Sequence, residues 1–227
     1  MSMLLEREYQ DRLVRIPVGD VMLEGNLNLP DAFPGIVLFA HGSGSSRKSP
    51  RNRFVAEALQ AEGLGTLLMD LLTSEEEALD MRTGHLRFDI DLLSERLLVA
   101  AKWLGSHPDA QGHPLGYFGS STGAAAALVA AARKPDSIKA VVSRGGRPDL
   151  AGNHLPKVKA PTLLIVGGRD SLVVDLNREA LALLDVDKEL KIIPWATHLF
   201  EEPGALEDVA RLAGNWFLRH FEASQTR

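Results

Sequence analysis

The sequence predicts an α/β fold with a doubly wound, mainly parallel β-sheet, formed by one domain of 227 residues (1–227). Short, continuous apolar runs such as 36–40 and 162–166 are typical of strands buried on both faces of a parallel sheet. Segments with helical periodicity alternate with these runs, and repeated strand–helix units build parallel sheets. In such sheets the functional site lies beyond the carboxyl ends of the strands.

The elements follow in order along the chain. Residues 13–18 and 21–27 predict two antiparallel strands joined by a turn at Gly19-Asp20. The later strands are expected at 36–40, 66–69, 117–118, 138–142, 162–166 and 190–193. Helices are expected at 53–62, 89–104, 124–133, 177–184 and 206–221. Only about twenty residues separate Val142 from Thr162, which is too few for a large cap domain.

The composition excludes several classes of protein. Hydrophobic residues make up 45% of the chain and charged residues 24%, as in soluble globular proteins, and a net charge of −5 gives no reason to expect nucleic acid as a partner. The absence of cysteine removes disulfides, thiolate metal sites and a thiol nucleophile. The N-terminus lacks the apolar core of a signal peptide, and no apolar run approaches the ~20 residues of a membrane span. We expect a cytoplasmic protein with neither a metal nor a cofactor.

One motif carries most of the functional signal. Gly119-Ser120-Ser121-Thr122-Gly123 lies between a predicted strand and an Ala-rich helix. A sharp turn at this place strains the backbone of its central residue and exposes that residue's side chain above the sheet. The pattern therefore predicts Ser121 as a catalytic nucleophile.

Two later segments supply the partners that such a serine needs. Asp170 follows the predicted strand 162–166, and His198 follows the strand 190–193, which gives the chain order Ser, Asp, His. Histidine can take the serine proton and return it to the leaving group, and a carboxylate on its other nitrogen fixes the tautomer. We assign the base to His198 and the acid to Asp170, with Asp175 as the alternative acid.

An oxyanion hole is expected between the nucleophile and an upstream loop. The loop His41-Gly42-Ser43-Gly44 follows the predicted strand 36–40 and can direct a backbone N–H into the site. We predict the N–H groups of Ser43 and Thr122 as the two donors. Gly42 or Gly44 could replace Ser43 after a small shift of the loop.

Taken together, these motifs resemble the α/β-hydrolase superfamily. The resemblance rests on His41-Gly-Ser-Gly, Gly119-Ser-Ser121-Thr-Gly, Gly167-Gly-Arg-Asp170 and Ala196-Thr-His198-Leu-Phe. The compact size and short late loops are similar to the dienelactone hydrolase-like branch. Founding members of that branch use a cysteine nucleophile where this chain has Ser121, which favours serine esterase chemistry over the dienelactone reaction.

Basic residues gather near the expected site, and two interpretations stay open for them. They can form surface ion pairs with the many acids, or a cationic rim that selects substrates carrying a carboxylate, as the resemblance implies. The basic residues are Arg47, Lys48, Arg51, Arg53, Arg144 and Arg147. Among them Arg47 and Arg144, together with Gly42, are the candidate substrate contacts.

The sequence thus predicts a serine esterase that cleaves small, short-chain carboxylic esters through an acyl-enzyme. Its expected partner is a small-molecule ester or lactone, not nucleic acid or membrane, and the sequence leaves a monomer and a homodimer equally open. A lactone hydrolase of the dienelactone hydrolase type is the first alternative. A non-catalytic ligand-binding protein on the same scaffold is the second.

Overall fold

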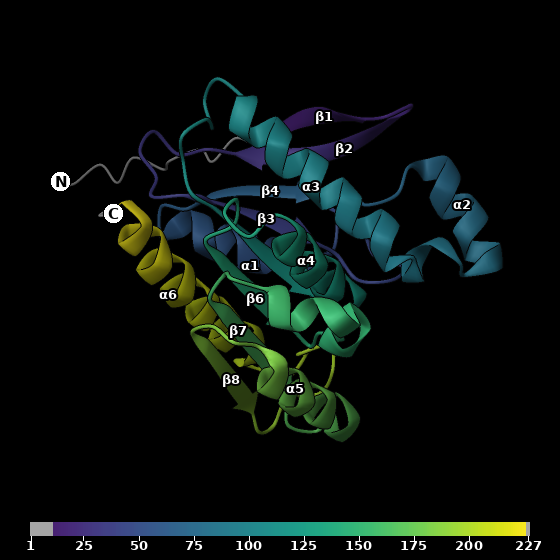
Figure 1. Cartoon of the computed structure of the whole chain (residues 1–227), viewed down its shortest axis with the longest axis vertical. Coiled ribbons are helices and arrows are strands. Elements are labelled where there is room, and N and C mark those ends of the chain that lie inside the picture. The colour runs from purple at the N-terminus through teal and green to yellow at the C-terminus, as the bar shows by residue number, and fades with distance from the viewer. Residues whose placement is uncertain (1–10, 226–227) are drawn as a thin grey trace.

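A computed structural model describes residues 11–225 of the chain. Its centre is an eight-stranded sheet in the order β1-β2-β4-β3-β5-β6-β7-β8 (Figure 1). The strands are β1 (Arg12–Val18), β2 (Val21–Asn28), β3 (Ile36–Ala40), β4 (Gly65–Met69), β5 (Leu115–Ser120), β6 (Ala140–Arg144), β7 (Thr162–Gly167) and β8 (Lys188–Ile193). The N-terminal segment, where no signal peptide is expected, lies outside the described residues.

The sheet is antiparallel at its N-terminal edge and parallel elsewhere. β1 and β2 form a hairpin whose turn contains Gly19 at φ 57°, a left-handed conformation that glycine adopts without strain. β2 also pairs antiparallel with β4, whereas all pairs from β4 to β8 are parallel. This topology confirms the predicted doubly wound sheet with an N-terminal hairpin.

Helices cover both faces of the sheet (Figure 1). Along each central strand successive side chains point to opposite faces, so that Leu38 and Tyr117 join one core and Phe39 and Phe118 the other. The first core packs against α3 (Ile90–Ser106), α4 (Thr122–Arg133) and α5 (Ser171–Leu183). The second core packs against α1 (Pro50–Ala61) and α6 (Ala205–Gln225).

This arrangement brings the candidate residues to one edge of the sheet. β3, β5, β6 and β7 are neighbours and run in the same direction, so the loops that follow them share that edge. The register places Ala40 beside Gly119 and Ser120 beside Arg144. Within residues 11–225 the connection from β6 to β7 holds only the short 3-10 segment η2 (Pro148–Lys157) and no large cap.

One helix near this edge was not predicted. α2 (Ser74–Thr83) stands out from the sheet at the right of Figure 1. Thr73 accepts a hydrogen bond from the N–H of Glu76, and the Glu76 carboxylate accepts one from the N–H of Thr73 at 2.8 Å. Arg96 of α3 holds the helix to the body by a 2.6 Å ion pair with Glu76. The capping-box spacing Thr73-x-x-Glu76 was the sequence signal that could have located this helix.

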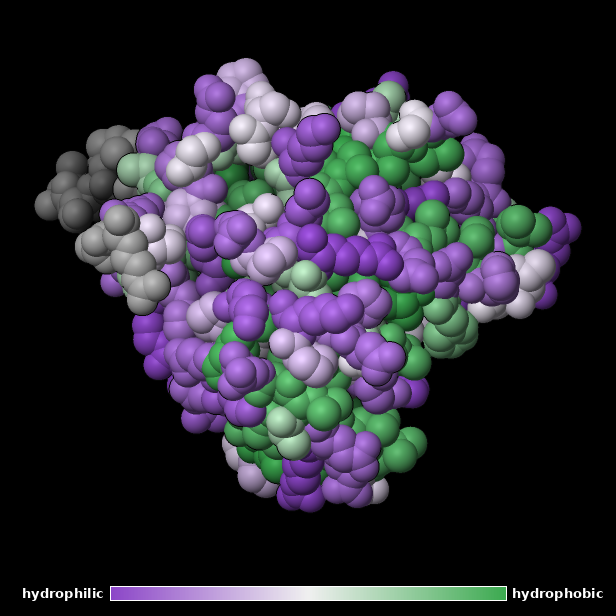
Figure 2. All heavy atoms as spheres, viewed as in Figure 1, coloured by the Kyte–Doolittle hydropathy of each residue, from purple (hydrophilic) through white to green (hydrophobic). Residues whose placement is uncertain are grey.

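The outer surface is mostly polar. Figure 2 shows hydrophilic side chains over most of the visible face, interrupted by smaller apolar areas. Among residues 11–225 no helix combines the length and the apolar character that crossing a bilayer requires.

Candidate active site

Ser121 occupies the strained turn that its motif predicts. It lies between the last residue of β5 and the first residue of α4, with φ 50° and ψ −121°. A positive φ is costly for a residue with a Cβ and persists only where the surroundings enforce it. Here the N–H of Ser121 donates to the carbonyl of Arg144 at 3.3 Å, and its own carbonyl accepts from the N–H of Arg147 at 3.1 Å. The neighbouring β6 and the loop after it therefore hold the turn.

Close backbone packing explains the glycines around Ser121. A Cβ on Gly123 would lie 2.3 Å from the carbonyl oxygen of Ala40, and one on Gly119 would lie 2.4 Å from the Cα of Ala124. Both contacts are with backbone, which cannot yield as a flexible side chain can. The glycines thus allow the helix start to approach β3 and the loop that follows it.

Asp170 and His198 are brought together by the loops after β7 and β8. The Nδ1 of His198 lies 2.6 Å from Oδ2 of Asp170. An ionised carboxylate only accepts, so Nδ1 donates, and in the neutral imidazole Nε2 is then the nitrogen without a proton. Asp175, the alternative acid, instead lies in α5 and pairs with Arg178 at 3.1 Å.

The histidine loop packs against the end of β6, next to the serine turn. A Cβ on Gly145 would lie 3.6 Å from Cε1 of His198, and Gly145 directly follows the residue whose carbonyl binds the N–H of Ser121. Phe200, two residues beyond His198, is fully buried and has φ 57°. With Ser121 it is one of two non-glycine residues at positive φ in the described chain. Backbone strain is therefore concentrated on both sides of the candidate site.

The expected oxyanion loop lies directly against Ser121. A Cβ on Gly42 would be 3.0 Å from the Cβ of Ser121, and the hydroxyls of Ser43 and Thr122 are 3.3 Å apart. Thr122 is the first residue of α4, so its N–H has no acceptor within the helix. The loop and the helix start thus meet beside Ser121, as an oxyanion hole requires.

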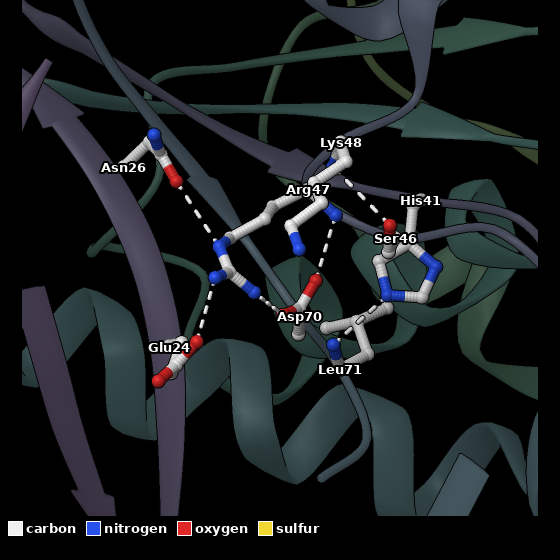
Figure 3. Close-up of polar contacts among 8 residues, drawn as sticks. All are labelled: Glu24, Asn26, His41, Ser46, Arg47, Lys48, Asp70 and Leu71. Carbon is white, nitrogen blue, oxygen red and sulfur yellow. Dashed lines mark hydrogen bonds and ion pairs between the residues drawn. The ribbon is translucent and has the colours of Figure 1, made fainter. Parts of the chain in front are cut away.

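His41, the first residue of this loop, fixes the loop to the residue after Asp70 (Figure 3). Its Nε2 accepts a hydrogen bond from the N–H of Leu71 at 2.9 Å. Nδ1 must then carry the proton, and it donates to the carbonyl of Gly42 at 3.0 Å. Burial lowers the pKa of His41, although the Gly42 carbonyl and Asp70 oppose part of that effect. The bond from Leu71 requires an unprotonated Nε2 and therefore a neutral imidazole, so His41 is a structural part of the loop.

This histidine makes stability depend on pH. A buried base with a lowered pKa favours the neutral folded state, so its contribution is complete above the unfolded pKa of ~6.5 and is lost as pH falls toward the folded pKa. Between pH 6.5 and 5 we expect the free energy of unfolding to fall faster in the wild type than in His41→Gln, by at most about 1.4 kcal/mol per pH unit. Urea unfolding at several pH values measures this. If the free energy of unfolding fell equally steeply with pH in the two proteins, the prediction would be contradicted. His220 is present in both proteins and therefore does not affect the comparison.

Arg47, a candidate substrate contact, is committed to structural partners instead (Figure 3). Its backbone N–H donates to Oδ1 of Asp70 at 2.7 Å, and its guanidinium also pairs with the Asp70 carboxylate. The same guanidinium donates to Asn26 at 3.1 Å and to Glu24 at 2.6 Å. Arg47 therefore ties the oxyanion loop to β2 and to the end of β4, and its charge is already neutralised.

Arg144, the other basic candidate, is buried beneath the site. Its Nη2 donates to Oδ1 of Asn52 at 3.3 Å, and its guanidinium lies 5.7 Å from the centre of the Phe200 ring. Burial, reinforced by the nearby charge of Arg51, lowers the pKa of Arg144 to about 10. The side chain supports the loop that carries His198 and does not line the cavity described next.

A cavity of about 550 Å³ opens beside the oxyanion loop. Ser43 and Thr122 line it next to the serine turn. Its other walls come from residues 44–46 and 48–51, from Leu71 and Leu72 after β4, and from α2. Gly42 also lines it. Within residues 11–225 no group of three or more His, Cys, Asp or Glu side chains is arranged to hold a metal ion.

Comparison with known proteins identifies the family to which this geometry belongs. The dienelactone hydrolase family matches residues 23–221. The chain belongs to the dienelactone hydrolase family. The crystal structure of dienelactone hydrolase from Anabaena variabilis is 62% identical, with a TM-score of 0.91, over 93% of this chain and 98% of that chain. The predicted α/β-hydrolase fold and dienelactone hydrolase-like branch are thus confirmed.

More distant members of the fold and one pair of longer proteins complete the comparison. Two esterases share the fold of this dienelactone hydrolase family member. The Pyrococcus furiosus esterase Pf2001 is 21% identical, with a TM-score of 0.76 over 94% of each chain. Est1E from Butyrivibrio proteoclasticus is 16% identical, with a TM-score of 0.77 over 92% of this chain and 99% of that chain. Two Mycobacterium tuberculosis proteins named "Putative phosphoribosyl transferase" are 56% identical over 93% of this chain. The chain spans 47% of their length.

Proposed function

We propose that this hydrolase-family protein is a serine esterase for small carboxylic esters. The observation that carries the proposal is the 2.6 Å bond from His198 to Asp170, which leaves Nε2 of the imidazole free to act as a base. The strained turn that exposes Ser121 lies against the same end of β6 as the histidine loop. We also propose that residues 1–227 form a single domain, because one continuous sheet organises the described chain.

These positions support the following reaction. Nε2 of His198 takes the proton of the Ser121 hydroxyl, whose oxygen attacks the ester carbonyl, and the N–H groups of Ser43 and Thr122 stabilise the resulting oxyanion. His198 then returns the proton to the departing alcohol, which leaves an acyl group on Ser121. A water molecule gives its proton to His198 and attacks this acyl-enzyme. Collapse of the second tetrahedral intermediate releases the acid, and His198 returns its proton to the Ser121 oxygen, which restores the hydroxyl.

The structure also supports a preference for small acyl groups. The connection from β6 to β7 contributes only η2, so it supplies no large lid to cover a long lipid chain. In a series of p-nitrophenyl esters we expect kcat/KM to be highest for acetate or butyrate and to fall as the acyl chain lengthens. A maximum at long chains would contradict the proposed substrate class.

A covalent probe tests the proposed nucleophile directly. A fluorophosphonate is attacked only by an activated serine, so we expect a single adduct on the peptide that contains Ser121. Substitution of His198 should prevent labelling because the hydroxyl then lacks its base. Labelling at another serine would show that Ser121 is not the nucleophile, and no labelling would favour the non-catalytic ligand-binding alternative.

Family membership supports lactone hydrolysis as a second candidate. A relative with 62% identity is a dienelactone hydrolase, and a lactone is a cyclic ester open to the same attack by Ser121. Comparing kcat/KM for a cyclic enol-lactone with that for a simple acetate ester distinguishes the two. Phosphoribosyl transfer, suggested by the name of the M. tuberculosis relatives, applies to proteins about twice as long as the segment they share with this chain.

A further inference from the structure

The cavity beside the oxyanion loop offers more hydrogen-bond donors than ester hydrolysis needs. Its volume of about 550 Å³ lies in the range of small-molecule sites. Ser43 and Thr122 line one wall, and the proposed reaction already uses their N–H groups as oxyanion donors. Four further serines line the remainder: Ser45, Ser46, Ser49 and Ser74. The chemistry of these walls indicates what the rest of a substrate carries.

The hydroxyls of this wall retain hydrogens that can be donated to a ligand. Ser49 is only 8% exposed, and its Oγ accepts from the N–H of Asn52 at 3.4 Å. The Oγ of Ser46 accepts from the N–H of Lys48 at 3.2 Å. Since a serine hydroxyl both donates and accepts, these bonds leave each O–H available.

Two cations on the same wall are incompletely neutralised. Arg51 pairs with the exposed carboxylate of Glu201 at 3.2 Å, but its Nε–H is buried without an acceptor. Lys48 has no ion pair within residues 11–225. Arg87, a third cation of the cavity, is by contrast occupied by Asp80, with Nε at 2.5 Å from the carboxylate and Nη2 at 2.9 Å from the carbonyl. A buried donor without an acceptor and an ammonium without a carboxylate in direct contact favour an anion at this wall.

The start of α1 adds positive potential to this wall. Ser49, Pro50 and Arg51, which cap and begin the 12-residue helix, all line the cavity, and the first turn contains no acidic residue. The amino end of a helix favours a bound anion. Glu77 of α2 is the opposing charge on the lining, since Asp80 is paired with Arg87. Burial, with Asp70 as the second cause, raises the pKa of Glu77, whereas Arg47 and Lys48 lower it.

From these contacts we propose that the cavity binds a phosphate group carried by the ester substrate. A phosphate monoester has a charge of about −1.5 to −2 and three acceptor oxygens, which matches two cations and several hydroxyls better than a singly charged carboxylate does. Lysine is also a common phosphate ligand as a point charge. The inference rests on the proposed esterase function and names its substrate class, an ester of a phosphorylated small molecule.

Three matched substrates test the proposal: 1-acetylglycerol, its 3-phosphate and its 3-carboxymethyl ether. Hydrolysis of each releases acetate, so one assay serves all three. We expect kcat/KM for the phosphate to exceed that for uncharged 1-acetylglycerol by about tenfold or more, because charge-assisted hydrogen bonds are among the stronger ones. If kcat/KM for the carboxymethyl ether equalled or exceeded that for the phosphate, the assignment to phosphate would be overturned.

Two substitutions with opposite expected signs locate the site. Lys48→Gln should raise KM for the phosphate about tenfold and leave hydrolysis of 1-acetylglycerol unchanged, since only the phosphate end loses its contact. Glu77→Gln should lower KM for the phosphate about threefold by removing a like charge. Lys102→Gln, an exposed lysine of α3 outside the cavity lining, is the matched control and should change neither substrate.

A binding measurement separates this inference from the proposed reaction. With the Ser121→Ala variant, calorimetry should detect binding of sn-glycerol 3-phosphate and no binding of glycerol. Adding Lys48→Gln should weaken the binding of the phosphate. Binding without turnover of any ester would support the phosphate site and remove the esterase proposal. Hydrolysis of all three esters at equal efficiency, with no phosphate binding, would support the esterase proposal and overturn the phosphate site.

Discussion

Replacing Ser121 with alanine is expected to abolish ester hydrolysis and to leave the fold intact. The substitution removes the attacking oxygen but keeps the Cβ in the same turn, so the backbone bonds to Arg144 and Arg147 remain. Removal of a catalytic serine typically lowers kcat by roughly 10⁴–10⁶. The measurement is kcat for a p-nitrophenyl acetate assay, with circular dichroism and urea unfolding to show that the protein is folded.

The adjacent Ser120 provides a matched control. Its side chain is buried and donates to Oδ1 of Asn52 at 2.9 Å, on the side of α1. Ser120→Ala should therefore cost about 1 kcal/mol of stability through one lost hydrogen bond and retain activity. If Ser121→Ala kept most of its activity, or if Ser120→Ala lost it instead, Ser121 would not be the nucleophile.

Replacing Arg47 with methionine is expected to destabilise the fold by about 3 kcal/mol. The Arg47 side chain is 12% exposed and neutralises an Asp70 side chain that is 13% exposed, so the substitution leaves a nearly buried carboxylate without its counterion. The same substitution frees the oxyanion loop from β2 and should also lower kcat. Urea unfolding monitored by circular dichroism gives the change in the free energy of unfolding.

Two further variants separate charge pairing from the loss of a side chain. Arg53→Met breaks only an exposed pair with Glu57 and should cost less than about 0.5 kcal/mol. Asp70→Asn in the Arg47→Met background should recover part of the stability because the isolated charge is removed. If Arg47→Met lowered the free energy of unfolding by less than about 1 kcal/mol, the pairing of Arg47 with Asp70 would contribute little to stability.

Buried apolar strands were predictable because their signal is local. The strand at Ile36–Ala40 agrees with its prediction at both ends. β5 was expected only at 117–118 yet covers Leu115–Ser120, since glycines interrupt its apolar run. Gly116 is there for packing: a Cβ on it would lie 2.6 Å from the ring of Phe217. Such a requirement comes from a distant helix and leaves no local pattern.

One helix was missed and two were expected to start later than they do. α2 buries only Asp80, so it lacks the helical periodicity that reveals other helices. α1 begins at Pro50, three residues before its expected start, because Ser49 caps it and proline is well suited to the first turn. α5 likewise begins directly after Asp170, six residues before its expected start.

The site shows the same division between local and distant information. Its loops could be predicted because each follows a recognisable strand, and the expected partners Asp170 and His198 do meet. The partners of the Arg47 and Arg144 side chains could not be predicted, since they lie far away in the chain. Sequence proximity to a site places an arginine near an edge of the sheet but does not say which acid or amide already binds it.

The two positive-φ residues described above have an evolutionary consequence. Ser121 and Phe200 hold the chain in conformations that a relaxed polypeptide avoids, and the rest of the fold compensates for that cost. Selection for heat resistance alone would therefore tend to replace Ser121 by glycine or asparagine, and selection for the proposed turnover would retain it. Phe200 would be kept in either case, because its buried ring contributes more to stability than its backbone conformation costs. Improvements in thermal tolerance for this scaffold should thus be sought in regions remote from positions 121 and 200.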